Sequence, residues 1–186
     1  MRERAGTKWR ALTTGTAVCV SVMIAAGAAA SVAAAQRASG AAAPNCTRAS
    51  TQVWLGLGLG GGTAGSTYYP LEFSNVGHRA CTLDGYPGVS AQGSGGGQIG
   101  PAATRNTGSH GTVTLAPGAT AHAILRVADW GALCSTEAHA VALRVFAPGE
   151  TGAEEVPFAF GACAHRGVLS VEPVRRGVGI PGYTTS

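Results

Sequence analysis

Short runs of alternating hydrophobic and polar residues recur along the chain from residue 52 onward, and none shows the three- and four-residue apolar spacing of a helix. Alternation with a period of two predicts strands that are buried on one face. In the clearest run, it places Val141, Leu143 and Val145 on one face. The expected strands are 52–57, 68–73, 89–92, 112–115, 121–127, 141–146, 156–160 and 167–171, with a helical turn over 129–134.

Pro-Gly pairs punctuate these runs. In each pair, Pro fixes φ for the first central turn position, and Gly accepts the positive φ of a type II turn. Such turns are expected at Pro87-Gly88, Pro117-Gly118, Pro148-Gly149 and Pro181-Gly182. Short strands between frequent turns predict an antiparallel, two-sheet β-sandwich. Pro70 marks an edge strand or a bulge, and Tyr86 is expected to cover the core with its hydroxyl at the surface.

The first 35 residues have the pattern of a secretory signal peptide. Arg2, Arg4, Lys8 and Arg10 precede an uncharged stretch of mostly small residues, and the best cleavage point follows Ala35. The uncharged stretch is also long enough to span a bilayer. A retained N-terminal membrane anchor is therefore the alternative, although Ala, Gly, Ser and Thr favour insertion less than Leu or Ile.

The leader also carries most of the net charge. The whole chain has 13 basic and 9 acidic residues, whereas the part after Ala35 keeps nine basic and eight acidic residues, a net charge of +1. Such a domain has no basic field to recruit nucleic acid or an anionic membrane, so membrane contact would require the retained leader. The sequence divides into a signal peptide (1–35), a flexible linker (36–45), a β-sandwich domain (46–173) and a disordered tail (174–186). We expect the protein to be a monomer.

Four cysteines follow the leader: Cys46, Cys81, Cys134 and Cys163. An even number in an exported domain predicts two disulfides, and four cysteines allow three pairings. Pairing in sequence order is the simplest, and each bridge would then close a loop of roughly 30 to 40 residues, worth up to about 4 kcal/mol. The cysteines lack the Cys-x-x-Cys spacing of a metal site.

Five segments together resemble a known family: AGSTYYPLEFSN, GHRACTLDGYPGVS, IGPAATRN, VTLAPGATAHAIL and, after a late cysteine, LRVFAP. The series is similar to the exported actinomycete proteins catalogued as domain of unknown function 4232, over roughly 46–173. The resemblance implies an immunoglobulin-like sandwich, secretion or attachment to the envelope, and the pairs Cys46–Cys81 and Cys134–Cys163. It implies no activity, and the leader departs from the lipoprotein type of many relatives.

Three motifs with catalytic or cofactor-binding counterparts lack the necessary context. Residues 56–61 fit Gly-x-Gly-x-x-Gly, but the next expected element is a strand and not the helix that would meet a dinucleotide. Glu154 and Glu155 are expected in a solvated loop, and on a strand they would point to opposite faces. Serine nucleophiles need a base and an orienting group. The serines considered are Ser66, Ser90, Ser94 and Ser109, the last beside His110.

The histidines are His78, His110, His122, His139 and His165. His110 and His122 flank the Pro117-Gly118 connection, and a hairpin there would bring them together as candidate metal ligands. A transition-metal site needs three or four convergent ligands. Otherwise His122, which shares a strand face with Arg126, is expected to be solvated.

Together these observations predict an all-β, immunoglobulin-like sandwich, secreted or in the cell envelope, that is not an enzyme and has no cofactor. We expect a binding or structural domain for an envelope or extracellular ligand, which acts through loops such as 93–97 on a rigid frame. The alternatives are an extracytoplasmic metal-handling protein that uses surface histidines and, third, a serine hydrolase.

Overall fold

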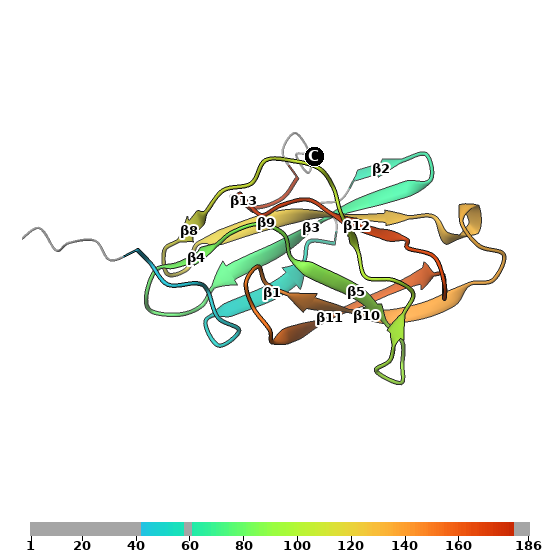
Figure 1. The fold of residues 1–186 in the computed structure, drawn as a ribbon, viewed down its shortest axis with the longest axis horizontal. Helices are drawn as coiled ribbons and strands as arrows, with labels where there is room; N and C mark the ends of the chain where they lie inside the picture. Colours follow the sequence, from blue (N-terminus) through green and yellow to red (C-terminus); the bar gives the residue numbers. More distant parts are fainter. Residues whose placement is uncertain (1–41, 58–60, 181–186) are drawn as a thin grey trace, which may run out of the picture. The chain divides into compact units, whose positions relative to one another are not determined.

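The computed structural model describes residues 42–57 and 61–180, so the leader and most of the predicted linker lie outside the described residues. The described chain forms strands and one short 3-10 helix (Figure 1). The elements are β1 (Thr51–Leu55), β2 (Gly61–Thr63), β3 (Ser66–Asn75), β4 (Cys81–Leu83), β5 (Gly88–Gln92), β6 (Gln98–Ile99), β7 (Thr104–Arg105), β8 (Val113–Leu115), β9 (Thr120–Ala128), η1 (Trp130–Ala132), β10 (Ala138–Phe146), β11 (Ala153–Ala162), β12 (Leu169–Val171) and β13 (Arg175–Arg176).

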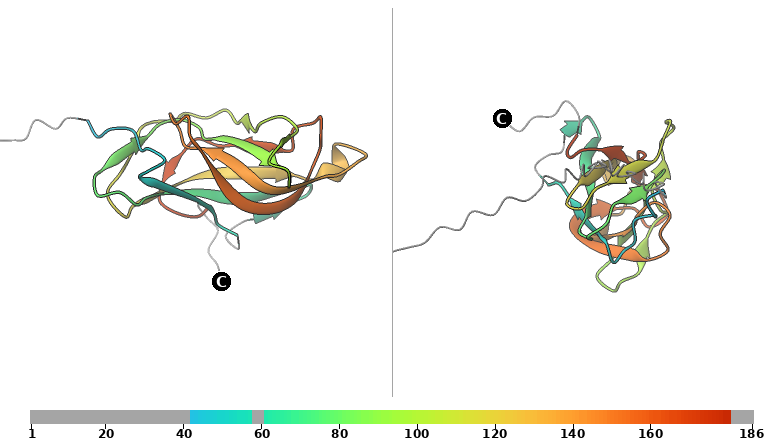
Figure 2. Two further views of the ribbon diagram at one scale, coloured as in Figure 1. Left: turned by 90° about the horizontal axis from the view of Figure 1, so that it is seen from below. Right: turned by 90° about the vertical axis from the view of Figure 1, so that its left-hand side faces the viewer.

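The strands form three sheets. A seven-stranded sheet has the order β1-β3-β9-β12-β7, with β2 also paired to β3 and β13 to β9; a four-stranded sheet has the order β11-β10-β5-β6. These two sheets face each other as layers (Figure 2), and β4 and β8 pair as a third, two-stranded sheet. The predicted all-β fold is confirmed, with one small sheet more than the two expected.

The core lies between the two larger sheets. Leu71, Phe73 and Leu125 from the seven-stranded sheet are fully buried against Leu143 and Val145 from the four-stranded one. Alternation explains these positions, because residues two apart on a strand share a face. The disulfides join Cys46 to Cys81 and Cys134 to Cys163, which confirms the predicted pairing.

The predicted hairpin around Pro117-Gly118 is wrong. β8 pairs with β4, whereas β9 pairs with β3 and β12. Pro117-Gly118 does make a turn, with Gly118 at φ 78°, but the chain passes through it from one sheet to another. β8 and β9 do not form a hairpin because β4 pairs with the three residues of β8, whereas the longer β9 lies in the seven-stranded sheet.

Two local predictions also need correction. Val141 is 45% exposed and does not share the buried face of Leu143, because a bulge between Ala140 and Ala142 shifts the alternation. Pro70 lies in an interior strand, with its carbonyl accepting the Gly56 N–H beyond the end of β1. The N–H and C=O of a strand residue point to the same neighbouring strand. The N–H that proline lacks would therefore point to the place beyond the end of β1, and not to a partner strand.

The Pro-Gly turns differ from one another. Gly149 has φ 82°, as a type II turn after Pro148 requires, but Gly88 is the first residue of β5 and has no positive φ. The prediction of a turn at Pro87-Gly88 is therefore wrong. Gly85, at φ 93°, is the left-handed residue of this segment. Gly88 instead packs against Phe146, and a Cβ at Gly88 would lie 3.4 Å from the Phe146 side chain.

Both predicted domain ends are more ordered than expected within the described residues. Thr82 of β4 donates its N–H to Pro44, and Cys46 donates to Thr82. Val174 is 2% exposed, and β13 pairs with β9. The expected disordered tail is therefore wrong for 174–180, and the linker already pairs with the domain at 44–45.

Candidate functional site

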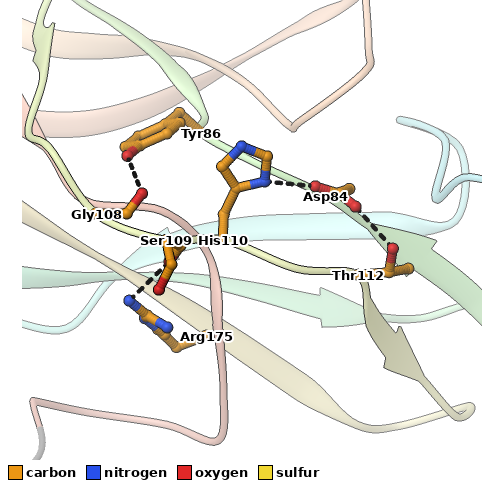
Figure 3. Close-up of polar contacts among 7 residues, drawn as sticks. All are labelled: Asp84, Tyr86, Gly108, Ser109, His110, Thr112 and Arg175. Atoms are coloured by element: carbon orange, nitrogen blue, oxygen red, sulfur yellow. Dashed lines mark hydrogen bonds and ion pairs between the residues drawn. The ribbon is translucent and has the colours of Figure 1, made fainter.

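A loop without secondary structure, 106–112, connects β7 to β8 and is fastened by Asp84, which follows β4 (Figure 3). Oδ1 of Asp84 lies 2.8 Å from Nδ1 of His110, and Oδ2 accepts a 2.7 Å hydrogen bond from the Thr112 hydroxyl. The hydrogen bond from Thr112 lowers the pKa of Asp84 most, and the contact with His110 lowers it further. The Asp84 and His110 side chains are 49% and 47% exposed, so solvent reaches the pair.

Tyr86 and Arg175 fasten the other half of the loop (Figure 3). The Tyr86 hydroxyl lies 2.7 Å from the carbonyl oxygen of Asn106 and 3.1 Å from that of Gly108, and Arg175 donates to the Ser109 carbonyl at 3.1 Å. The Tyr86 ring packs against the core, as expected, but its hydroxyl binds the loop instead of lying free at the surface. These contacts make the cluster a loop clamp.

The Asp84–His110 pair resembles the base and orienting group of a serine hydrolase. Ser109, however, contributes its carbonyl oxygen and not its hydroxyl, and within residues 42–57 and 61–180 no hydrogen bond joins a serine hydroxyl to His110. The Ser66 hydroxyl donates to the Gly65 carbonyl instead. In the described part of the chain, the Asp84–His110 pair therefore has no serine hydroxyl hydrogen-bonded to it.

His122 differs from its prediction in both partner and exposure. It is 3% exposed, not solvated, and its Nδ1 lies 2.9 Å from the Gly177 carbonyl oxygen. His110 binds Asp84 instead, so each of the two candidate ligands has its own partner. In the part of the chain that the structure describes, no group of three or more His, Cys, Asp or Glu side chains is placed to hold a metal ion.

Residues 177–180, which follow β13 and are here called the C-terminal strap, cover a carboxylate beside His122. Glu72 pairs across the strands with His122 and faces away from the core, since Leu71 and Phe73 face into it. Glu72 is 0% exposed, and its Oε1 accepts the Gly179 N–H at 2.6 Å. Among the residues that the structure describes, Oε2 has no hydrogen-bond partner. Burial raises the pKa of Glu72, partly opposed by the Gly179 hydrogen bond and by His122.

An open cleft of about 420 Å³ lies where η1, the β2–β3 turn and β11 meet. Four half-buried aromatic residues line it: Tyr69 of β3, Trp130 of η1, and Phe158 and Phe160 of β11. The Phe158 ring centroid is 5.0 Å from Tyr69, edge to face, and 5.0 Å from Phe160, stacked. Hydroxyl groups of Thr63, Ser66 and Thr67 complete the wall. We call this site the aromatic cleft.

Trp130 is held in the aromatic cleft from several sides. Gly161 lets the indole lie directly on the β11 backbone, because a Cβ there would collide with the Trp130 ring. Asp129 caps η1, because its Oδ1 accepts the Gly131 N–H at 3.0 Å. The Cys134–Cys163 disulfide then joins the segment after η1 to the end of β11. The ring is thus positioned by packing, capping and a covalent bridge.

Sequence reasoning did not identify the aromatic cleft. Phe158 and Phe160 alternate on one strand, which signals a shared face, but nothing local links them to Tyr69 or Trp130. The Glu154–Glu155 pair, expected in a loop, lies in β11, where Glu154 accepts the Val53 N–H at 3.1 Å. Of the Gly-rich motif, 58–60 lie outside the described residues, and the element that follows is the strand β2.

The fold and its bridges define a disulfide-stabilised all-β domain of the kind found in oxidising, extracytoplasmic compartments. Within the described residues, no helix has the length and apolar character to cross a membrane. The chain belongs to the family described as Domain of unknown function (DUF4232), whose model matches residues 46–175. No curated protein and no solved structure matches it.

Proposed function

We propose that this protein is a non-catalytic binding module that works outside the cytoplasmic membrane and takes its ligand in the aromatic cleft. The observation that carries the proposal is the set of four half-buried rings around an open space of about 420 Å³. Binding sites for small molecules are typically concave, with aromatic walls and a few polar groups. Rings left half-buried retain apolar surface that a ligand can cover.

Rigidity supports the same proposal. The two facing sheets, Gly161 under Trp130 and the Cys134–Cys163 bridge fix the rings before any ligand arrives. A preformed site loses less conformational entropy on binding than one that must be ordered. The loop clamp around Asp84 adds to the frame, since side-chain contacts from Asp84 hold 106–112 in place.

A ligand panel tests the binding proposal. The exported, oxidised protein is titrated with neutral saccharides, aromatic acids and organic amines while its indole N–H signals are followed by ¹⁵N NMR. Trp54→Phe identifies the Trp54 signal, which belongs to the outer face of β1 and should not move. We expect at least one class to shift the Trp130 signal, and to lose affinity in Phe160→Leu. A panel that leaves Trp130 unmoved throughout would refute the proposal.

Export has its own test. We propose that the leader is cleaved after Ala35, with the envelope or the extracellular medium as the destination. The intact mass of the exported protein should be that of a chain that begins at Gln36. It should lie four hydrogens below the mass of the reduced chain, because both disulfides are formed. A mass that includes residues 1–35 would instead support the N-terminal anchor.

A second candidate, metal handling, rests on the Asp84–His110 contact. A carboxylate at Nδ1 orients an imidazole so that Nε2 can bind a metal. Calorimetric titration with Zn²⁺ and Cu²⁺ is the test, and binding tighter than micromolar that His110→Ala abolishes would favour this function over the first.

A further inference from the structure

Two carboxylates stand beside Trp130. Asp129 is exposed and lines the aromatic cleft, with its N–H bound to the Gly65 carbonyl at 2.9 Å. Glu137 lies in the segment before β10. A Cβ added at Gly161 would collide with both the Trp130 indole and Glu137 Oε1, so the two side chains meet over Gly161. Asp129 precedes η1 and lines the cleft, whereas Glu137 follows η1 and comes close to the indole at Gly161 without lining the cleft itself.

The charge around the cleft is one-sided. None of the described residues that line it is Lys, Arg or His, and its one ionisable carboxyl group is Asp129. Glu137 Oε1 lies 3.5 Å from Nδ1 of the exposed His139. This acidity is local, because the chain after the leader carries a net charge of +1.

Aromatic faces carry partial negative charge and attract cations, most strongly for Trp and more so where water is excluded. We propose that the ligand of the aromatic cleft is a small methylated ammonium compound, an inference that rests on the proposed binding function. Its charge faces Asp129 and Glu137, and its methyl groups cover the rings of Trp130, Phe158 and Phe160.

Methylation follows from the hydrogen bonds the cleft offers. A primary ammonium has three N–H donors that need acceptors, whereas a quaternary ammonium has none. Phe158 and Phe160 have no hydrogen-bond acceptor, and the Trp130 indole N–H is a donor only, so the ring side of the cleft offers no acceptor to a primary amine. The volume of about 420 Å³ lies within the range that is typical of small-molecule sites.

The test compares choline with its neutral isostere, 3,3-dimethylbutan-1-ol, on the exported, oxidised protein, with the Trp130 indole signal as readout. We expect choline to bind about tenfold or more tightly than the isostere. Ethanolamine, which has a primary ammonium, should bind more weakly than choline. Asp129→Asn and Glu137→Gln should each weaken choline about threefold and leave the isostere unchanged.

Glu155→Gln is the matched control, because Glu155 is an exposed carboxylate of β11 that pairs with Arg144, away from Gly161 and Trp130, and does not line the cleft. Melting temperature and disulfide mass show that each variant is folded. Equal binding of choline and the isostere, or binding of saccharides or aromatic acids alone, would overturn the cation inference while leaving the binding function intact. If no compound of either set shifts Trp130, both proposals fail.

Discussion

Gly161 shows how one missing side chain shapes the aromatic cleft. A Cβ at this position would overlap the Trp130 indole, whereas at Gly62, on the opposite wall, it would meet nothing within 4 Å. We expect Gly161→Ala to displace Trp130 and to lower the free energy of unfolding by about 1–3 kcal/mol, as overpacking does. Gly62→Ala is the control and should change neither. Urea denaturation and the Trp130 indole signal measure both effects, and an unmoved signal in Gly161→Ala would contradict the packing.

Asp84 gives a second prediction for a single residue. Hydrogen bonds from Thr112 and His110 lower its pKa in the folded protein. Its stabilising contribution is therefore present above the pKa of the unfolded chain, and it is lost as pH falls through the lower, folded value. Asp84→Asn should lower the melting temperature at neutral pH, and the difference from the parent should shrink below about pH 4. A difference that is the same at all pH values would show that the carboxylate charge plays no part.

At the scale of elements, we expect the C-terminal strap to control the ionisation of Glu72. Burial raises the folded pKa of Glu72, so its contribution to stability is fully present below the unfolded pKa and is lost as pH rises through the folded value. We expect Glu72→Gln to remove this loss of stability above about pH 4. The amide keeps an acceptor for the Gly179 N–H and carries no charge.

Removal of the strap provides the control. A chain that ends at Arg176 keeps β13 but exposes Glu72 to water, so its stability should lose the same pH dependence even with Glu72 unchanged. Equilibrium unfolding in urea across the pH range measures both variants. If the shortened chain and the full chain have the same pH profile, the strap does not govern the ionisation of Glu72.

Alternation was sufficient to predict most strands, because each buries one face against a common core. It failed where pairing depends on distant partners. β8 pairs with β4, and the bulge at Ala140/Ala142 turns Val141 outward, and neither is visible in a local pattern. The loop clamp and the aromatic cleft likewise join residues that are far apart in the sequence, such as Asp84 with His110 and Tyr69 with Phe158. His122 was expected to be solvated, but it is buried and contacts Gly177 of the strap, a segment that was expected to be disordered.

For the whole molecule, the two disulfides should act alike on stability and differently on the site. They span 35 residues (Cys46–Cys81) and 29 residues (Cys134–Cys163), so chain entropy predicts similar losses of up to about 4 kcal/mol when either pair is replaced by serine. Only Cys134–Cys163 joins the segment after η1 to the end of β11. Its removal should therefore shift the Trp130 indole signal under native conditions, whereas removal of Cys46–Cys81, which fastens the N-terminal segment to β4, should leave that signal in place. Urea midpoints and NMR spectra of the two double variants separate the effects. Equal displacement of Trp130 in both would mean that the bridges support the cleft only through global stability.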